Sequence, residues 1–407
     1  MNGTANVRIS GSSLVELVCV PVCTLLFLFT ALSICLVVLG RHTAGTRDYI
    51  EYWASGQQLV HHRNPYNITE ILKLERAEGL PDSVRAMVMG NAPPALLLTY
   101  PLGFVDAQTG QYVWMFVLLG SLVASVRLLR SALETHKQIV SIIGYTFGPA
   151  LVCIAAGQMA ILVLLGLSIF LRFYKDRPFI AGAALWLCLF KPQILMPFGV
   201  VMCVWIWRHR QLKLFAGTVS ALSVSAGLVW VLDPNCWGEY REMMRLMRYD
   251  QVIIPCLSMV LRDSMPRVPI VQYAPAALGS VWAMAFFWKH KRHWDWIKHG
   301  SNVLLVSLLT PPYTWFIDQC VALPALLRGA TVTRSRMMVA ILALATAVIE
   351  FGPFTKHELM HSKWYLWTTP FYLIWYLVST RGYAKTSSAD IATASSEACD
   401  SPEEARV

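Results

Sequence analysis

Residues 47–66 read RDYIEYWASGQQLVHHRNPY and directly follow the first long apolar segment of the chain. Apolar, aromatic and small residues recur here at three- and four-residue steps, which predicts a helix with one aromatic face. The residues on this face are Tyr49, Tyr52, Trp53, Gly56, Leu59 and Val60. An aromatic face opposite charged residues is typical of a helix that lies in the membrane interface. We therefore expect Asp48, at the start of the helix, to lie just outside a bilayer.

The composition of the whole chain indicates a membrane protein. Of 407 residues, 56% are hydrophobic and 14% are charged, and the mean hydropathy is +0.50. A soluble domain carries roughly a quarter charged residues. The net charge of +10 comes from short basic clusters between apolar runs, so it does not form a nucleic-acid-binding face. The sequence predicts an all-α polytopic integral membrane protein with no nucleic-acid partner.

Twelve apolar segments give about twelve expected transmembrane helices, although several are shorter than the about 20 residues of a full span. The segments are 14–39, 111–129, 139–156, 159–173, 179–190, 194–207, 214–232, 274–288, 299–310, 319–328, 337–352 and 364–379. The first is interpreted as a retained span rather than a signal peptide. Segments 179–190 and 194–207, split by Lys191-Pro192-Gln193, fit a hairpin that turns within the membrane. We expect one transmembrane unit, 1–384, with interfacial helices in a first external loop, 41–92, and a disordered cytoplasmic tail, 385–407.

The distribution of charge gives an orientation. With the N-terminus in the cytoplasm, six junctions fall inside: 127–138, 172–177, 208–213, 289–298, 328–336 and 381–385. They hold 18 Lys and Arg against three acids, whereas the other side holds 14 Lys and Arg against 15 acids. Because cytoplasmic loops are enriched in Lys and Arg, this asymmetry supports the orientation.

The polar clusters that do not resemble cytoplasmic anchors all fall on the outer side. They are Arg47-Asp48, Asn64-Pro65-Tyr66, Asn91-Ala92-Pro93-Pro94, Gly157-Gln158, Lys191-Pro192-Gln193, Thr310 to Trp315 with Asp318, and Lys356-His357 with His361. Polar groups at membrane depth are costly and are usually functional. Seven clusters from separate parts of the chain therefore predict one site on the outer face.

Each cluster also has a structural interpretation. Asp48 with Glu51 three residues later fits a helix capping box, and Asn64 with Pro65 fits a turn. Lys191 fits a side chain that snorkels to the interface, although it lies among apolar residues far from other basic clusters.

Histidine and cysteine spacings leave two further possibilities. His357 and His361 stand four residues apart, which suits a metal, but no third ligand is evident, and we expect neither metal nor cofactor. Cys236 and Cys256 share one expected external loop, where a disulfide is possible.

Five stretches together resemble glycosyltransferase family 87, the polyprenyl-phosphate-mannose-dependent mannosyltransferases of bacterial membranes. They read RDYIEYWASGQQLVHHRNPYN, NAPPALLLTYPL, GQMAILVLLGLSIFLRF, AGAALWLCLFKPQILMPF and TPPYTWFIDQCVALPALL. The resemblance covers the chain to about residue 330 and implies a GT-C-like fold with a catalytic acid in the first external loop, which Asp48 matches. The usual YPP or NPP block here reads Asn91-Ala92-Pro93-Pro94. A histidine that some members carry is absent between Thr310 and Asp318, so its role would pass to His357 or His361.

The resemblance implies transfer of one sugar from a polyprenyl phosphate, with mannose or, as in related enzymes, arabinofuranose as the sugar. Asp48 would be the general base that takes the proton of the acceptor hydroxyl. Lys191, supported by Arg47 or His357, would stabilise the departing phosphate. One carboxylate without an obvious nucleophile favours inverting single displacement. The expected sugar- and acceptor-binding residues are Tyr49, Trp53, Asn64, Tyr66, Gln158, Gln193, Trp315 and Asp318.

These features give the expected partners and the rival functions. The partners are a polyprenyl-phosphate sugar donor, a lipid or glycan acceptor and the bilayer of the plasma (inner) membrane, with the site on its extracytoplasmic side. The alternative is a transporter or flippase for a lipid-linked sugar. That class usually shows internal repeats and ionisable residues near the midplane, neither of which is evident here. A ligase that moves whole glycans would need a larger external loop than 233–273.

Overall fold

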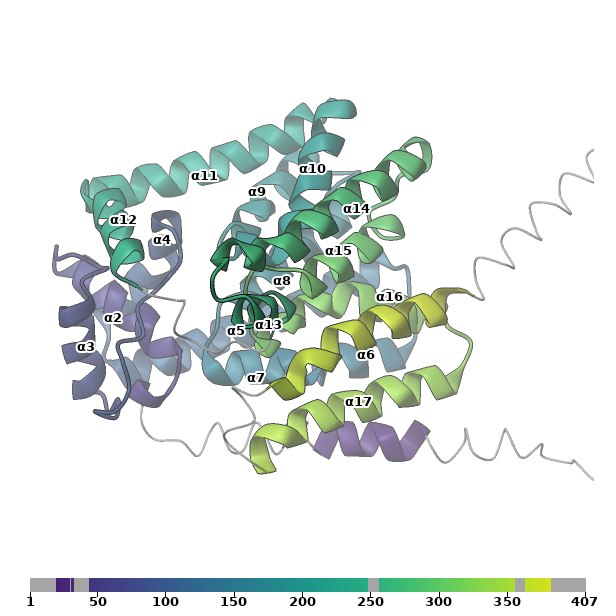
Figure 1. The fold of residues 1–407 in the computed structure, drawn as a ribbon, viewed down its shortest axis with the longest axis horizontal. Coiled ribbons are helices and arrows are strands. Elements are labelled where there is room, and N and C mark those ends of the chain that lie inside the picture. Colours follow the sequence, from purple (N-terminus) through teal and green to yellow (C-terminus); the bar gives the residue numbers. More distant parts are fainter. Residues whose placement is uncertain (1–19, 30, 33–43, 248–255, 356–362, 382–407) are drawn as a thin grey trace, which may run out of the picture.

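The computed structural model describes residues 20–29, 31–32, 44–247, 256–355 and 363–381. Over these ranges the chain is helical and has no strand, in agreement with the expected all-α class (Figure 1). The expected tail at 385–407 and much of the first apolar segment lie outside them.

The described α-helices run between connections that are mostly short. They are α2 (Tyr49–Val60), α3 (Ile68–Ala77), α4 (Leu96–Thr99), α5 (Ala107–Ala132), α6 (Gln138–Tyr145), α7 (Gly148–Ala156), α8 (Ala160–Phe173), α9 (Pro178–Cys188), α10 (Met196–Arg208), α11 (Leu212–Leu232), α12 (Cys236–Leu246), α13 (Leu257–Ser264), α14 (Ala274–His290), α15 (His299–Leu309), α16 (Leu323–Val332) and α17 (Arg336–Thr355). Residues 20–29 and 368–381 are also helical. The short 3-10 helices are η1 (Ala44–Thr46), η2 (Pro93–Ala95), η3 (Tyr100–Phe104), η4 (Pro192–Leu195), η6 (Pro269–Tyr273), η7 (Lys291–His293), η8 (Phe316–Ala322) and η10 (Lys363–Trp367).

Four described stretches are long and apolar enough to cross a membrane: Ala107–Ala132, Gln138–Ala156, Leu212–Leu232 and Pro269–His293. Other apolar helices are shorter. For example, α8 has 14 residues, so at about 1.5 Å per residue it reaches about 21 Å, less than the about 30 Å of a bilayer core. Most expected apolar segments are therefore helical, but twelve full spans and a GT-C fold are not confirmed.

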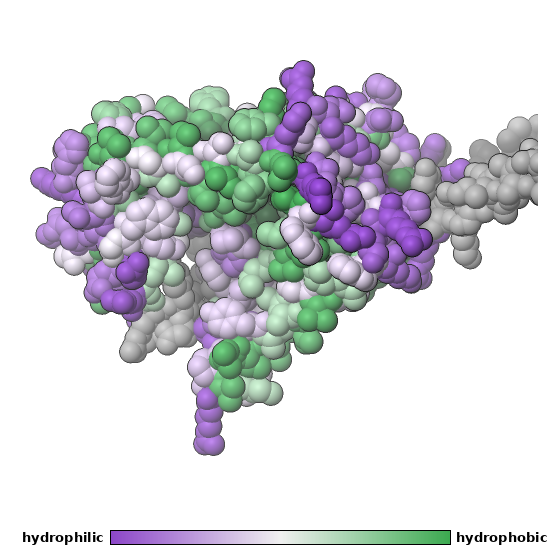
Figure 2. All heavy atoms as spheres, turned by 90° about the horizontal axis from the view of Figure 1, so that it is seen from above, coloured by the Kyte–Doolittle hydropathy of each residue, from purple (hydrophilic) through white to green (hydrophobic). Residues whose placement is uncertain are grey.

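The lateral surface is apolar. Large hydrophobic side chains are exposed along α5, α11 and α14, among them Phe116, Val231 and Leu278. Figure 2 shows hydrophobic residues gathered in the middle of the visible face and hydrophilic residues toward both its ends. Such a continuous apolar surface is unusual in a soluble monomer and fits contact with lipid.

One end of the molecule carries the long connections. Figure 1 groups α2, α3, α4 and α12 there, and we call residues 44–106 and 233–247 the loop end. The helix α8 leads away from it, because α8 begins beside the Gly157-Gln158 turn and ends at the basic segment that contains Arg172.

The expected cytoplasmic junctions meet one another at the far end of α8. Lys137 donates to the Thr331 carbonyl, Arg172 donates to Ser131 Oγ, and Lys175 pairs with Asp295. Four of the six basic junctions therefore lie together, and we call residues 127–138, 172–177, 289–298 and 328–336 the basic end. Which side of the membrane it faces stays a prediction.

The helix α2 is buried on more than its expected aromatic face, and its place in the membrane interface stays a prediction. Nine of its twelve residues are buried, and it packs against η1, η3, α3, α4 and α5. Its contact with η3 is a backbone contact, because a Cβ on Gly103 of η3 would lie 2.3 Å from the Gly56 carbonyl oxygen. The helix α2 is thus packed into the protein body.

The pair α9 and α10 diverges rather than forming a closely packed hairpin. The helix α9 packs chiefly on α8 and α11, whereas α10 packs on α14 and α15. The turn that contains Lys191 therefore lies where two helix layers separate. Whether this turn lies within the membrane stays a prediction.

Candidate active site

The turn between α7 and α8 is the foundation of the site. Gly157 ends α7 in the left-handed region at φ +81°, which favours glycine. A Cβ on Gly157 would lie 2.6 Å from Tyr49 Cβ, so the start of α2 packs directly on this turn. The Trp114 indole donates to the Gly157 carbonyl at 2.7 Å and holds the turn from α5. This packing places Gln158 beside Asp48.

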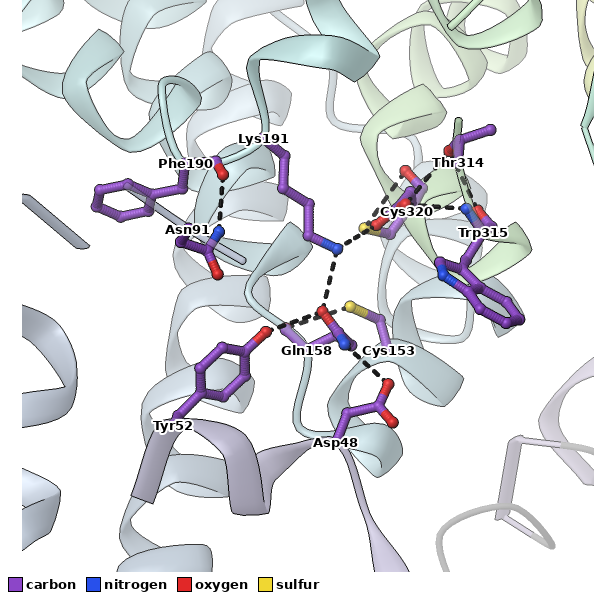
Figure 3. A network of polar contacts seen from close by, with 11 residues as sticks. Asp48, Tyr52, Asn91, Cys153, Gln158, Phe190, Lys191, Thr314, Trp315 and Cys320 are labelled. Atoms are coloured by element: carbon purple, nitrogen blue, oxygen red, sulfur yellow. Dashed lines mark hydrogen bonds and ion pairs between the residues drawn. The ribbon is translucent and has the colours of Figure 1, made fainter. Parts of the chain in front are cut away.

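Gln158 connects to two residues of the α2 region. Its Nε2 donates to Asp48 Oδ2 at 2.8 Å, and its Oε1 accepts from the Tyr52 hydroxyl at 2.9 Å (Figure 3). Asp48 makes no side-chain capping hydrogen bond to α2, so the capping-box interpretation is wrong. The Asp48 carboxylate is instead held by a residue 110 positions away in the sequence.

Lys191 reaches the same amide from another helix layer. The antiparallel packing of α9 on α8 returns the chain to the level of the α7–α8 turn. Lys191 Nζ then lies 3.0 Å from Gln158 Oε1 and 2.7 Å from Asp318 Oδ1 (Figure 3). The side chains of Lys191 and Asp318 are 11% and 2% exposed. This is a buried ion pair rather than a side chain that snorkels to the interface.

Asp318 is fixed by its own segment. It lies in η8, after Pro311-Pro312, and its Oδ2 accepts from the Trp315 backbone amide at 3.0 Å and from Thr314 Oγ1 at 3.2 Å. An amide and a hydroxyl thus donate to one oxygen of this carboxyl group, and the Lys191 ammonium donates to the other. A chain of polar contacts thus runs from Asp48 through Gln158 and Lys191 to Asp318, and we call these four residues the polar chain.

Asn91 connects the first loop to the same turn. Its Nδ2 donates to the Phe190 carbonyl at 2.7 Å, next to Lys191 (Figure 3). The backbone carbonyl of Asn91 accepts from the Tyr66 hydroxyl at 3.0 Å. Asn64 Oδ1 accepts from the Tyr66 amide at 2.7 Å, so Asn64 shapes the turn before α3. These contacts stabilise the wall of the site.

Other expected site residues lie outside the polar chain. Tyr49 and Trp53 are buried, and the Trp53 indole donates to the Val105 carbonyl at 2.9 Å. The Arg47 guanidinium lies against α5, where it contacts Met115 and, with the Gln111 amide turned to match donors with acceptors, Gln111 Oε1.

Two other expected residues, Gln193 and Trp315, lie in the turns of the site, and a third lies outside the described residues. Gln193 is half-buried two residues after Lys191, and the Trp315 side chain is half-buried at the start of η8. His357, and with it His361, lies outside the described residues.

Sequence reasoning missed several residues that belong to the site. Tyr52 was expected only on the aromatic face, but its position four residues after Asp48 places both on one side of α2. Thr314 belonged to an expected polar cluster but had no predicted role, and its hydroxyl donates to Asp318, four residues later. Glu51 was considered only as part of a cap, yet burial, followed by the Asp48 charge, raises the pKa of its carboxyl to about 8. The available signal was one helical turn of separation from an expected site residue.

Two other expectations concern metal and cysteine. Among the described residues, no three His, Cys, Asp or Glu side chains are grouped so that they could hold a metal ion. Cys236 and Cys256 are both buried free thiols, so the possible disulfide between them does not form in this structure.

Comparison with models of protein families matches residues 91–312 to glycosyltransferase family 87. The matched range is more than half of the 407 residues and includes Gln158 and Lys191, whereas Asp48 and Asp318 lie beyond its two ends. Comparisons with curated proteins and with solved structures give no match. The resemblance identified from the five sequence stretches is therefore confirmed.

Proposed function

The chain belongs to glycosyltransferase family 87, and we propose that it transfers a single mannose from a polyprenyl-phosphate donor to a lipid or glycan acceptor. The observation that carries the proposal is the polar chain. It joins the expected base, Asp48, to the expected phosphate-binding cation, Lys191, through one amide at 2.8 and 3.0 Å. The family indicates a membrane glycosyltransferase, and the apolar helices agree with it.

Asp48 is the proposed general base. An acceptor hydroxyl must lose its proton as it attacks the anomeric carbon, and a positioned carboxylate can take that proton. Asp48 is suited to this role because it is half-buried and its Oδ2 is oriented by Gln158. Attack and departure occur in one displacement, so the anomeric configuration inverts.

Lys191 is the proposed phosphate contact. An ammonium has three N–H donors, and two of those on Lys191 point to Asp318 and Gln158. The third suits an oxygen of the departing polyprenyl phosphate, where a charge-assisted hydrogen bond stabilises the growing negative charge. Because Asp318 holds the ammonium at 2.7 Å, Lys191 is already in place when the donor binds.

Fewer residues are proposed as sugar contacts than the sequence suggested. Tyr49, Trp53 and Tyr66 are buried in packing contacts, so their rings support the walls. Trp315 and Gln193 lie within three residues of Asp318 and Lys191 in the sequence and are half-buried, and they are the proposed contacts to the sugar or acceptor. The polyprenyl tail would lie against the apolar lateral surface.

The proposed setting follows from the orientation of the charges. Residues 1–384 form one transmembrane unit in the plasma (inner) membrane, residues 41–92 form its first external loop, and 385–407 a cytoplasmic tail. The site then opens on the extracytoplasmic side, because Asp48 and Gln158 lie about one α8 length away from the basic end.

The test is a transfer assay with the full chain in lipid nanodiscs. Polyprenyl-phosphate-mannose is supplied with candidate lipid acceptors, and the products are identified by mass spectrometry. We expect a product heavier by one hexose whose new linkage has the inverted anomeric configuration. Parallel arms with polyprenyl-phosphate-arabinofuranose and with a nucleotide-activated mannose test the donor. Transfer only from the nucleotide sugar would contradict the polyprenyl-phosphate donor, and retention of configuration would contradict single displacement.

A further inference from the structure

We propose that Gln158 is a positioning residue that separates the Lys191 ammonium from the Asp48 carboxylate by an uncharged amide and so preserves the basicity of Asp48. The inference rests on the proposed function, in which Asp48 is the base. It replaces the sugar-binding role expected for Gln158 from the sequence. The argument depends on the hydrogen bonds of one side chain.

The orientation of the Gln158 amide is determined by its neighbours. A lysine ammonium can only donate, and an ionised carboxylate can only accept. Oε1 must therefore face Lys191, at 3.0 Å, and Nε2 must face Asp48, at 2.8 Å. Exchanging the two atoms would place donor against donor and acceptor against acceptor.

Little of the amide remains for a substrate. Oε1 already accepts two hydrogen bonds, from Lys191 and from the Tyr52 hydroxyl at 2.9 Å, which match its two lone pairs. Nε2 keeps one further N–H. A side chain with this arrangement is suited to fixing its neighbours rather than to recognising the several hydroxyls of a sugar.

The backbone of Gln158 is fixed as well. Its amide donates to the Cys153 carbonyl at 2.9 Å, and its carbonyl accepts from the Cys153 thiol at 3.4 Å. The preceding residue, Gly157, is also fixed, because it has φ +81° and contacts Tyr49. The amide therefore projects from a rigid turn, which a positioning residue requires.

Separation matters because a cation in direct contact would make Asp48 a weaker base. An opposite charge within about 4–6 Å lowers a carboxyl pKa by roughly 1–3 units. A base whose pKa is far below the working pH takes a proton less readily. Here two hydrogen bonds and an amide stand between the charges, and Asp318, at 2.7 Å, partly neutralises the ammonium.

The titratable groups around Gln158 come from every packed element. They are Asp48, Glu51 and Tyr52 at α2, Cys153 at α7, Lys191 at the α9–η4 turn, and Tyr313, Asp318 and Cys320 at or before η8. The carboxyl groups of Asp48 and Glu51 are the acids on the α2 side, so a new carboxylate at position 158 acts first on them.

The main test is Gln158→Glu. It keeps the acceptor for Lys191 and Tyr52 but replaces the N–H that faces Asp48 with a carboxylate oxygen. Two adjacent carboxylates cannot both ionise easily, so the acidic limb of the kcat/KM profile should move up by about one pH unit or more. Gln108→Glu is the matched control, because Gln108 is exposed at the start of α5 and its side chain contacts Tyr112. The control profile should not move.

A second measurement does not depend on sugar transfer. A water-soluble carbodiimide modifies protonated carboxyl groups, and peptide mapping by mass spectrometry reports its reaction at Asp48 as a function of pH. The Gln158→Glu titration should shift in the same direction as the kinetic limb. If the parent protein transfers no sugar from a polyprenyl phosphate, the proposed function fails, while this titration still decides the role of Gln158.

Gln158→Met provides a variant without a new charge. Its side chain has similar length but cannot bridge Asp48 and Lys191. We expect kcat to fall at least about tenfold while the affinity for the donor stays within about threefold. A rise in sugar KM with an unmoved pH limb in the Glu variant would identify Gln158 as a substrate contact and overturn the inference. Parental kcat in the Met variant would overturn it as well.

Discussion

The polar chain and the basic end each contain a lysine–aspartate pair, and the two pairs differ in burial. In the polar chain, the Lys191 and Asp318 side chains are 11% and 2% exposed and lie 2.7 Å apart. At the basic end, Lys175 and Asp295 are 65% and 33% exposed and lie 3.4 Å apart. An exposed pair contributes about 0–1 kcal/mol, whereas burying two charges carries a desolvation cost that only good geometry offsets.

The difference in burial indicates a different role for each pair of charges. Charges at the basic end lie on short connections between helices, where they suit membrane orientation without being buried. The three charged residues of the polar chain come from three separate segments, and hydrogen bonds from an amide and a hydroxyl help to hold them. A buried cation is poor evidence for stability, so its presence here points to chemistry.

The largest expected effect lies in the polar chain, at Asp48. Asn can still accept the Gln158 hydrogen bond, but it cannot take a proton. We expect Asp48→Asn to fold, to melt like the parent protein and to lose about 10²–10⁴ in transfer rate. The measurements are single-turnover transfer and thermal unfolding.

Asp106→Asn is the matched control for Asp48. Asp106 is exposed and caps α5 by accepting from the Thr109 amide at 2.9 Å, a role in which Asn serves about as well as Asp. Its transfer rate should be parental. Near-parental transfer by Asp48→Asn would remove Asp48 from the mechanism.

The next effect separates the two ion pairs directly. Lys191→Ala leaves Asp318 buried without its cation, which should cost about 3–5 kcal/mol of stability, whereas Lys175→Ala should cost less than about 1 kcal/mol. Lys191→Ala should also weaken donor use more than acceptor use, and Lys191→Arg should keep part of the activity because the charge remains. Chemical unfolding in detergent and steady-state kinetics measure both. Equal losses of stability for the two alanine variants would contradict the proposed difference between the buried and the exposed ion pair.

A smaller effect concerns a buried carboxyl at the loop end for which we find no cation among the described residues. Glu75 is fully buried, its Oε2 accepts from the Met87 amide, and its Oε1 has no hydrogen-bond partner. Burial raises the pKa of this carboxyl to about 8, from an ordinary value of 4.5. The folded state therefore favours the protonated form, and the contribution to stability is full below about pH 4.5 and is lost as the pH rises toward 8.

Glu75→Gln tests this difference from Asp318, whose cation is in place. Since Gln resembles the protonated acid, the variant should lack the Glu75 part of the decline, which is at most about 1.4 kcal/mol per pH unit. Unfolding curves at several pH values measure it, with the parent protein as reference. Parallel pH dependences for the two proteins would show that Glu75 is ionised in the fold.

The last prediction concerns the membrane orientation and is tested by chemical labelling of cysteines, without a change in activity or stability. Single cysteines in a cysteine-free version should react with an impermeant thiol reagent at Asp82 and Glu242 of intact cells, and should be protected at His209 and His293. All four positions are exposed on the protein surface, so protection would come from the membrane. The reverse pattern would place the polar chain on the cytoplasmic side.

The sequence by itself determined the class of the protein and its family. Long apolar runs in lipid form helices, because the backbone N–H and C=O groups there must form their hydrogen bonds within the segment. The apolar runs are evident from the sequence alone. The residues Asp48, Gln158, Lys191 and Asp318 were also identifiable, because each interrupts or borders an apolar run.

Only the tertiary structure decided how those residues act on one another. Sequence pattern treated Asp48 as a possible cap, Lys191 as a possible anchor and Gln158 as a sugar contact, since local spacing shows only neighbours within a turn or two. The contacts that matter span 110, 33 and 127 residues. They exist because α2 packs on the Gly157 turn and α9 returns beside α8, and hydrophobic patterning specifies which face of a helix is buried but not its partner.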